Sequence, residues 1–261
     1  MNTPRGVVES DRVACLQPLD VFVLAGGLGT RLQSVLGGLP KLLAPIGDRP
    51  YLAYLLDWLR RFGARRIVFG LGYKAEAISA YLRDNSHPDL MSETVIEPRA
   101  LGTAGAIRFA RAELRSDPVL VLNGDSYVDA DLCNFLAHHR AARKRATILC
   151  ADVDDAGRYG RVLLDGDGHI REFAEKDPTF SNRSTVNAGM YLVSATLLDE
   201  IAASDAVSLE RDLFERLPAG TLAAFASSSN FIDIGTPASL AEASKVLCRS
   251  DARDQKRASS S

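Results

Sequence analysis

The chain lacks long hydrophobic runs, has no excess of basic charge and contains few cysteines. No apolar run approaches the roughly 18 residues of a membrane-spanning helix, so we expect no membrane association. A net charge of −2 offers no basic surplus for a nucleic-acid backbone, so nucleic acid is not an expected partner. The four cysteines are widely spaced and form no C-x-x-C pair, which predicts free thiols in a reducing cytoplasm. They are Cys15, Cys133, Cys150 and Cys248.

The composition that remains is typical of a folded globular protein. Of the 261 residues, 46% are hydrophobic and 25% are charged, which is sufficient for a substantial core. Residues 1–18 are mixed and polar without the apolar centre of a signal peptide, so we expect a flexible leader there. Residues 249–261 are polar and serine-rich, which predicts a disordered tail. One folded domain over residues 19–248 and a cytoplasmic location are therefore expected.

One stretch, residues 21–45 (VFVLAGGLGTRLQSVLGGLPKLLAP), carries the strongest functional pattern. A short apolar run ends in a glycine-rich turn, and closely spaced glycines allow backbone N–H groups to approach a ligand. A helix beginning just after the turn would direct its positive dipole end at an anion such as phosphate. Arg31 and Lys41 add two cations, although a tight strand–helix connection with two solvated basic residues would look similar. The turn residues are Leu24, Ala25, Gly26, Gly27, Gly29 and Thr30.

Strands and helices alternate through the first half of the chain. Apolar runs predict strands at 21–25, 66–71, 91–97 and 119–122, and apolar residues at helical spacing predict helices at 50–62, 77–82 and 102–114. Such alternation is typical of a Rossmann-like α/β fold with a mixed, mainly parallel sheet flanked by helices. Ligands of such sheets sit beyond the carboxyl ends of the strands. Both the glycine-rich turn and Asp125 fall at such ends, so we expect them to share one crevice.

The second half of the chain reads differently. A strand is expected at 146–151, followed by a hairpin with Asp-Gly turns at 161–173. A strand at 185–193, a helix at 209–217, strands at 222–226 and 231–234 and a helix at 237–247 complete the expected elements. Asp233 ends an apolar strand and precedes a small-residue turn, as Asp125 does. Taken alone, each aspartate also fits a turn-capping role.

The string in residues 24–45 resembles the signature of the sugar-1-phosphate nucleotidyltransferases, L-A-G-G-x-G-x-R-L followed by P-K-x-x-x-P. The resemblance continues to about residue 246, with L-N-G-D at 122–125 and F-I-D-I-G-T at 231–236. Among these enzymes the D-glycero-α-D-manno-heptose 1-phosphate guanylyltransferases are most similar, although Leu42 replaces their usual second proline. The resemblance implies transfer of a nucleotidyl group from an NTP to a sugar 1-phosphate, with release of pyrophosphate.

The resemblance also implies roles for individual residues. It makes Arg31, Lys41 and Asp125 catalytic, and it makes Asp125 and Asp233 ligands of Mg²⁺, a cation that prefers carboxylate and phosphate oxygens. Besides the turn residues, it assigns Glu97, Gly102 and Thr103 to the nucleotide, although Glu97 would equally suit a solvated strand end. It assigns to the sugar Asn123, Tyr159, Gly160, Glu175, Lys176, Asn187 and Gly189.

The expected substrates are GTP and a manno-configured heptose 1-phosphate, for synthesis of a surface polysaccharide or glycoconjugate precursor. Mannose 1-phosphate with GTP, or a hexose phosphate with UTP or dTTP, is the alternative within the enzyme class. A non-catalytic nucleotide-sugar sensor on the same fold is the alternative outside it. Members of the family often form homo-oligomers, so a homo-oligomer is expected here.

Overall fold

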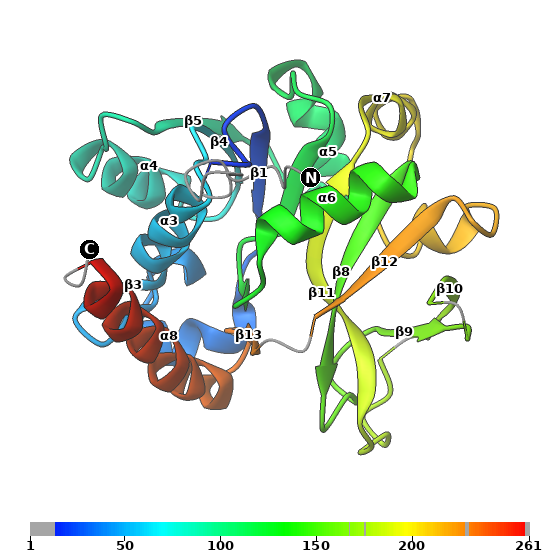
Figure 1. Ribbon diagram of the computed structural model, residues 1–261. Coiled ribbons are helices and arrows are strands. Elements are labelled where there is room, and N and C mark those ends of the chain that lie inside the picture. The colour runs from blue at the N-terminus through cyan, green and yellow to red at the C-terminus, as the bar shows by residue number, and fades with distance from the viewer. Residues whose placement is uncertain (1–13, 167, 175, 228–229, 259–261) are drawn as a thin grey trace, which may run out of the picture.

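A mixed sheet forms the centre of the molecule (Figure 1). The computed structural model describes residues 14–166, 168–174, 176–227 and 230–258, the segment 248–258 by its backbone alone. Four strands from the first half run parallel in the order β6, β1, β4, β5. Their bounds are β1 Asp20–Ala25, β4 Arg66–Leu71, β5 Met91–Ile96 and β6 Val119–Asn123. The predicted parallel core is thus confirmed.

Strands from the second half extend the sheet on the far side of β6. The strand β11 (Ser184–Val193) pairs antiparallel with both β6 and β8 (Ala146–Val153). Beyond it, β12 (Leu222–Ser227) runs parallel to β8. The predicted hairpin is confirmed as β9 (Arg161–Leu164) and β10 (Ile170–Ala174), at the lower right in Figure 1. The strand β11 therefore connects the parallel strands β6, β1, β4 and β5 to a second group, β8, β12, β9 and β10, in which parallel and antiparallel pairs both occur.

The alternation of side chains along β1 explains why helices cover both faces of the sheet. Val21 and Val23 lie in one buried cluster with side chains of α3, α4, α6 and α8, whereas Phe22 lies in a second cluster with α5 and α7. Successive strand residues point to opposite faces, so an unbroken apolar run needs cover on both. The helices are α3 Tyr51–Arg61, α4 Ala75–Asp84, α5 Gly102–Ala110, α6 Leu132–Ala142, α7 Ala195–Ala203 and α8 Pro237–Ala258.

The direction in which the chain adds strands to the sheet reverses between β1 and β6. From β1 the chain moves to β4 and β5 on one side, and then returns to form β6 on the other side. In open sheets of this type the crevice at such a reversal is where ligands bind. The glycine-rich turn follows β1 and Asp125 follows β6, so both lie at this crevice as expected.

Two short strand pairs lie off the main sheet. The strand β7 (Ser126–Val128) pairs antiparallel with β13 (Phe231–Asp233), which places Asp233 opposite Ser126. The strands β2 (Pro45–Ile46) and β3 (Arg49–Pro50) form the other pair, and α8 contacts both β2 and β13. The last helix therefore packs on two short strands that are far apart in the sequence, one of which ends in Asp233.

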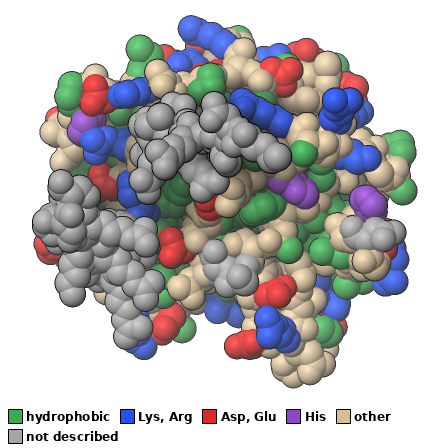
Figure 2. All heavy atoms as spheres, in the orientation of Figure 1, with side chains coloured by type: hydrophobic (Ala, Val, Ile, Leu, Met, Phe, Trp, Pro, Cys, Tyr) green, Lys and Arg blue, Asp and Glu red, His purple; other side chains and the backbone are tan. Residues whose placement is uncertain are grey.

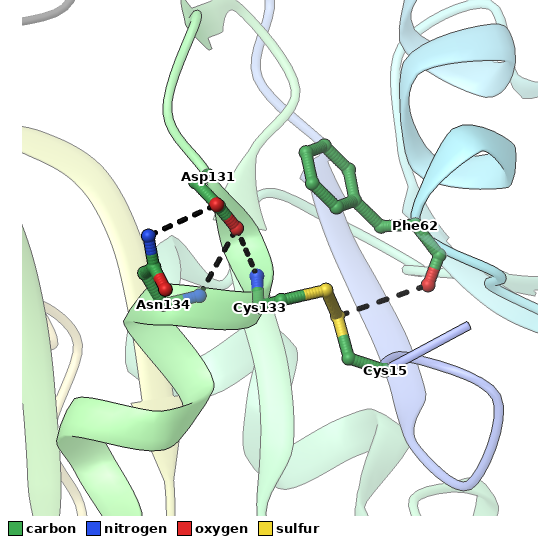
Figure 3. The surroundings of a disulfide bond; sticks show 5 residues. All are labelled: Cys15, Phe62, Asp131, Cys133 and Asn134. Atoms are coloured by element: carbon green, nitrogen blue, oxygen red, sulfur yellow. Dashed lines mark hydrogen bonds between the residues drawn. A yellow bond between two sulfur atoms is a disulfide. The ribbon is translucent and has the colours of Figure 1, made fainter. Parts of the chain in front are cut away.

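The prediction of free thiols is wrong for two of the four cysteines. Cys15 and Cys133 form a disulfide that links the segment before β1 to the start of α6 (Figure 3). Asp131 caps the same helix, because its carboxylate accepts hydrogen bonds from the Cys133 and Asn134 amides. Cys150 is a free, buried thiol, and its burial raises the pKa to about 12. Pairing across 118 positions leaves no local signature in a sequence.

Three further expectations differ from the structure. Residues 209–217 form turns and a 3₁₀ turn at Phe214–Arg216 instead of an α-helix. The helix α8 continues to Ala258, so most of the predicted tail at 249–261 is helical backbone. In the predicted leader, residues 14–18 form turns in which Leu16 is buried, while residues 1–13 lie outside the described residues. Packing of Leu16 under the sheet accounts for the last difference.

Charge is mixed on the surface. On the face shown in Figure 2, the described Lys and Arg side chains lie among Asp and Glu side chains instead of gathering in one basic area.

Among the described residues, no helix combines the length and apolarity that crossing a membrane requires.

Candidate active site

A cavity of about 360 Å³ lies beyond the carboxyl ends of β1 and β6. Lys41 and Asp125 form part of its wall, and so do eight of the nine residues that the sequence assigns to the nucleotide. Those eight are Leu24, Ala25, Gly26, Gly27, Gly29, Glu97, Gly102 and Thr103. The structure therefore gathers segments from four parts of the chain around one space.

The glycine-rich turn brings main chain close to neighbouring groups. A Cβ on Gly26 would lie 2.6 Å from Glu97 Oε1, so only glycine lets the Glu97 carboxylate lie over this backbone. Gly29 has a φ of 58°, a left-handed conformation that favours glycine. The turn is followed by a 3₁₀ turn, Thr30–Leu32, and by the four-residue helix α2 (Gln33–Leu36). The expected helix dipole is therefore small, and backbone approach is the main contribution of this turn.

Glu97 is a buried carboxylate on the wall of this cavity. Its Oε2 accepts a hydrogen bond from the Leu101 N–H at 3.1 Å. Burial raises the pKa of Glu97, and the Leu101 hydrogen bond only partly offsets that effect. The solvated alternative is therefore excluded, because the side chain lies inside the protein next to Gly26.

A second cavity of about 450 Å³ adjoins the first. Asn123 and Asp125 line both cavities, so a group bound in one would lie beside a group bound in the other. Six of the seven residues that the sequence assigns to the sugar line this second space. They are Asn123, Tyr159, Gly160, Lys176, Asn187 and Gly189.

A bulge in β11 shapes the second cavity. The pairing of β11 with β8 shifts register between Asn187 and Met190, and Gly189 within it has a φ of 72°. A Cβ on Gly189 would lie 2.5 Å from Asn123 Nδ2, so glycine lets β11 approach the end of β6. Bulges next to binding sites redirect side chains, and this one turns Asn187 toward the cavity that it lines.

Lys41, Asp125 and Asp233 form a charged cluster where the two cavities meet. Lys41 Nζ donates to Asp125 Oδ2 at 2.5 Å, and the Ile234 amide donates to the Asp125 carbonyl oxygen at 2.9 Å. Burial and then the neighbouring Asp125 charge raise the pKa of Asp233, while the Lys41 charge acts in the opposite direction. Two carboxylates 108 positions apart are thus held side by side by the pairing of β7 with β13.

The donor set of this cluster fits a divalent cation. Asp233 Oδ1 is buried and has no hydrogen-bond partner among the described residues. A buried carboxylate oxygen without a partner is costly, and a cation held between Asp233 and Asp125 would satisfy it. Magnesium is commonly held by one or two carboxylates together with substrate phosphates, which matches the residues present.

Two of the predicted residues that the structure describes are not brought into this arrangement. Thr30 and Arg31 lie on the exposed 3₁₀ turn and line neither cavity. Glu175 lies outside the described residues. Contact of Arg31 with a ligand therefore stays a prediction.

The structure also brings to the site residues that sequence reasoning missed. Glu210 lines the second cavity, and its carboxylate accepts a hydrogen bond from the Tyr191 hydroxyl. Tyr51 lies buried under the acidic cluster and donates to the Ser126 carbonyl oxygen at 3.0 Å. Glu210 falls in a segment that looked helical from its apolar spacing, and no motif marks it.

Comparison with known proteins identifies the family of this chain. A family model described as nucleotidyl transferase matches residues 21–250. The chain belongs to this family. The resemblance inferred from the sequence motifs is thereby confirmed, and it covers nearly the whole described fold.

The relatives share one class of activity in their names. A D-glycero-α-D-manno-heptose 1-phosphate guanylyltransferase of Campylobacter jejuni is 31% identical over 84% of this chain and 96% of its own length. A mannose-1-phosphate guanylyltransferase of Mycobacterium tuberculosis is 33% identical over 88% of this chain, and this chain spans 65% of that relative's length.

Solved structures agree with the fold. The crystal structure of HddC from Yersinia pseudotuberculosis superposes with a TM-score of 0.78 at 33% identity, over 87% of this chain and 98% of that one. A second HddC structure, at 32% identity, is complexed with GMP-PN. A single nucleotidyltransferase domain with a mainly parallel, mixed sheet is thus the architecture of this chain.

Proposed function

We propose that this protein transfers GMP from GTP to a sugar 1-phosphate, with D-glycero-α-D-manno-heptose 1-phosphate as the first-choice acceptor. The Lys41–Asp125–Asp233 cluster carries the proposal, because it lies where the two cavities meet. In the proposal the nucleotide occupies the cavity of about 360 Å³ and the sugar occupies the cavity of about 450 Å³. The α-phosphate and the sugar phosphate would then meet at the shared residues.

The reaction joins two anions. A phosphate oxygen of the sugar 1-phosphate attacks the α-phosphorus of the triphosphate and forms a new P–O bond. The bond from the α-phosphorus to the oxygen bridging to the β-phosphate breaks, and pyrophosphate leaves with the electron pair. The barrier is mainly electrostatic, so placed cations and in-line positioning can supply most of the catalysis.

Each charged side chain has a proposed role in this step. Lys41 and Lys176 would neutralise the phosphates that approach one another, and Arg31 would turn inward to bind the triphosphate and the departing pyrophosphate. Asp125 and Asp233 would hold Mg²⁺. When bound, that ion would supply positive charge that offsets the negative charge of the phosphates.

The choice of base rests on Glu97 and on the relatives. A buried carboxylate facing the nucleotide cavity is an acceptor suited to the amino group of guanine. The heptose and mannose relatives are both named guanylyltransferases, which supports GTP without separating the two sugars. Mannose 1-phosphate is therefore the alternative acceptor.

A pyrophosphate-release assay tests the proposal. The purified protein is incubated with Mg²⁺, each of four NTPs and a panel of sugar 1-phosphates that includes the manno-heptose, mannose and glucose forms. We expect release with GTP and the heptose phosphate at the highest kcat/KM. A preference for UTP or dTTP would contradict the guanylyl assignment. Release with no pair would favour a non-catalytic nucleotide-sugar sensor.

We also propose a product and a location for this activity. A GDP-sugar formed in the cytoplasm would serve as an activated precursor for a surface polysaccharide or glycoconjugate. We propose that the protein acts there on small molecules, without nucleic acid, and as a homo-oligomer that light scattering would detect.

A further inference from the structure

A loop between α7 and β12 connects the walls of the two cavities. Residues 204–212 pack against the first turn of α5 on one side and against β11 on the other. The Asp212 carboxylate holds this loop in place by accepting the Val207 and Ser208 amides at 2.9 and 2.8 Å. The loop is therefore a fixed connection between elements that face different substrates.

On the nucleotide side, the loop is bonded to the residues that open α5. The Ala104 amide donates to the Val207 carbonyl oxygen at 3.0 Å, and the Leu209 amide donates to Thr103 Oγ1 at 2.7 Å. Gly102 allows this contact, because a Cβ there would lie 2.4 Å from the Val207 oxygen. Gly102 and Thr103 both line the nucleotide cavity.

On the sugar side, Glu210 begins a directed series of hydrogen bonds. Its Oε1 accepts from the Tyr191 hydroxyl at 2.7 Å, and the Tyr191 oxygen accepts from Asn187 Nδ2 at 3.0 Å. Asn187 Oδ1 then accepts the Gly189 amide at 2.9 Å. Glu210 Oε2 accepts from the hydroxyls of Ser208 and Thr103 at 3.2 and 3.4 Å. The carboxylate therefore contacts both the nucleotide side, through Thr103, and the sugar side, through Tyr191.

The order of donors in this series is set at both ends, by the Glu210 carboxylate and by the Gly189 amide. An ionised carboxylate only accepts, so Tyr191 must donate to it and can then only accept from Asn187. Tyr191 keeps its proton, because burial and next the Glu210 charge raise its pKa well above the usual value. The Asn187 amide is thus fixed with one Nδ2 hydrogen left for a ligand in the cavity that it lines.

We propose that Glu210 is a positioning residue that orients the Asn187 amide as a donor to the sugar 1-phosphate and ties that orientation to the nucleotide-binding turn of α5. The inference rests on the proposed function, since it takes the second cavity as the sugar site. Glu210 acts through Tyr191 and Asn187. Its own oxygens are both engaged within the protein.

Glu210→Gln tests the directed order with almost no change of shape. A glutamine amide can donate to the Tyr191 oxygen, which would then no longer be held as the acceptor of Asn187 Nδ2. The Gly189 amide would still hold Asn187 Oδ1, so the Asn187 side chain would be fixed at one end only. We expect KM for the sugar 1-phosphate to rise about tenfold, the scale of one charged hydrogen bond. KM for GTP is expected to stay within about twofold, and the thermal midpoint to change little.

Tyr191→Phe provides the partner variant. If both residues act in one series, the double variant raises KM no further than the larger single effect, so the double-mutant cycle shows strong non-additivity. Asp212→Asn is the comparison for a purely structural role. It loosens the loop without touching Asn187, and it is expected to lower the thermal midpoint while changing both KM values alike.

Two outcomes would overturn the inference. If the double variant raised KM for the sugar 1-phosphate by the product of the two single effects, Glu210 and Tyr191 would act independently. If Glu210→Gln left that KM unchanged, Glu210 would have no positioning role. The orientation itself is read without catalysis, from the side-chain amide resonances of Asn187 in substrate-free protein. A shift of those resonances in Glu210→Gln supports the series even if no sugar 1-phosphate reacts, which separates this test from the proposed function.

Discussion

Lys41 Nζ lies 2.5 Å from Asp125 Oδ2, although the two residues are 84 positions apart in the chain. The contact joins the 3₁₀ turn Lys41–Leu43 to the turn that follows β6, at the reversal of strand order. It couples a cation and an anion at the place where the proposed phosphates would meet. Charge balance at this point is therefore expected to govern turnover more than folding.

Asp125→Asn tests this balance. The side chain is partly exposed, so the substitution should leave the fold and the thermal midpoint nearly unchanged. Loss of the carboxylate charge should lower kcat at least about 100-fold, a typical scale for lost electrostatic support. Asp129→Asn, an exposed aspartate close by, is the matched control with wild-type turnover. Unchanged kcat in Asp125→Asn would remove this residue from the site.

The raised pKa of Asp233 predicts a pH-dependent stability. Burial and the Asp125 charge make the folded protein hold this proton at a pH where an unfolded aspartate, with a pKa of about 3.9, has released it. The folded state then binds more protons, so this residue's contribution to stability is lost as pH rises through its folded pKa. With chelator present, Asp233→Asn should gain stability over wild type as pH increases across that interval.

Denaturant titrations at several pH values check this expectation. Asp48→Asn removes an exposed carboxylate and should give no such pH-dependent gain. Addition of Mg²⁺ should stabilise the wild type and have little effect on Asp233→Asn, because ligand binding to the folded state raises stability. Equal stability of wild type and Asp233→Asn at every pH would contradict the raised pKa of Asp233.

The disulfide predicts a dependence on redox conditions. Closing a loop of 118 positions restricts the unfolded chain, and such bonds typically contribute about 2–4 kcal/mol. Reduction should therefore lower the free energy of unfolding by about that amount and release two more titratable thiols. Cys15→Ser and Cys133→Ser proteins should not be destabilised further by reductant. A thiol count that reductant does not change would show that the bond does not form in solution.

Gly189→Ala probes the bulge at the sugar cavity. A left-handed φ of 72° costs a non-glycine residue about 1–2 kcal/mol, and the added methyl would also press on Asn123. We expect a loss of stability of at least that size and a higher KM for the sugar 1-phosphate. Gly166→Ala is the control, because a Cβ there meets nothing within 4 Å. Equal thermal midpoints for the two variants would contradict the close approach of β11 to β6.

The sequence predicted the elements that are marked by a pattern within a few neighbouring residues. Apolar runs such as Val21–Ala25 and Arg66–Leu71 match β1 and β4, because strands buried on both faces need uninterrupted apolar residues. The glycine-rich turn and Asp125 were placed correctly at the strand ends, because a parallel sheet brings such ends together. The contact of Asp233 with this crevice was expected only from the resemblance.

The sequence did not predict features that depend on distant pairing. The disulfide between Cys15 and Cys133 needs the segment before β1 to lie beside α6, which no spacing reveals. Residues 209–217 have apolar positions at helical spacing, but Leu209 and Phe214 pack into the core from turns instead. Glu210 gains its partners only because this loop lies between α5 and β11.

The pairing of β7 with β13 has a consequence for behaviour on warming. Three residue pairs join β13 to β7, and short strand pairs of this kind open at lower free energy than the central sheet. When β13 opens, Asp233 leaves Asp125 while the main sheet stays intact. Activity should consequently disappear several degrees below the main unfolding transition, and saturating divalent cation should narrow that gap.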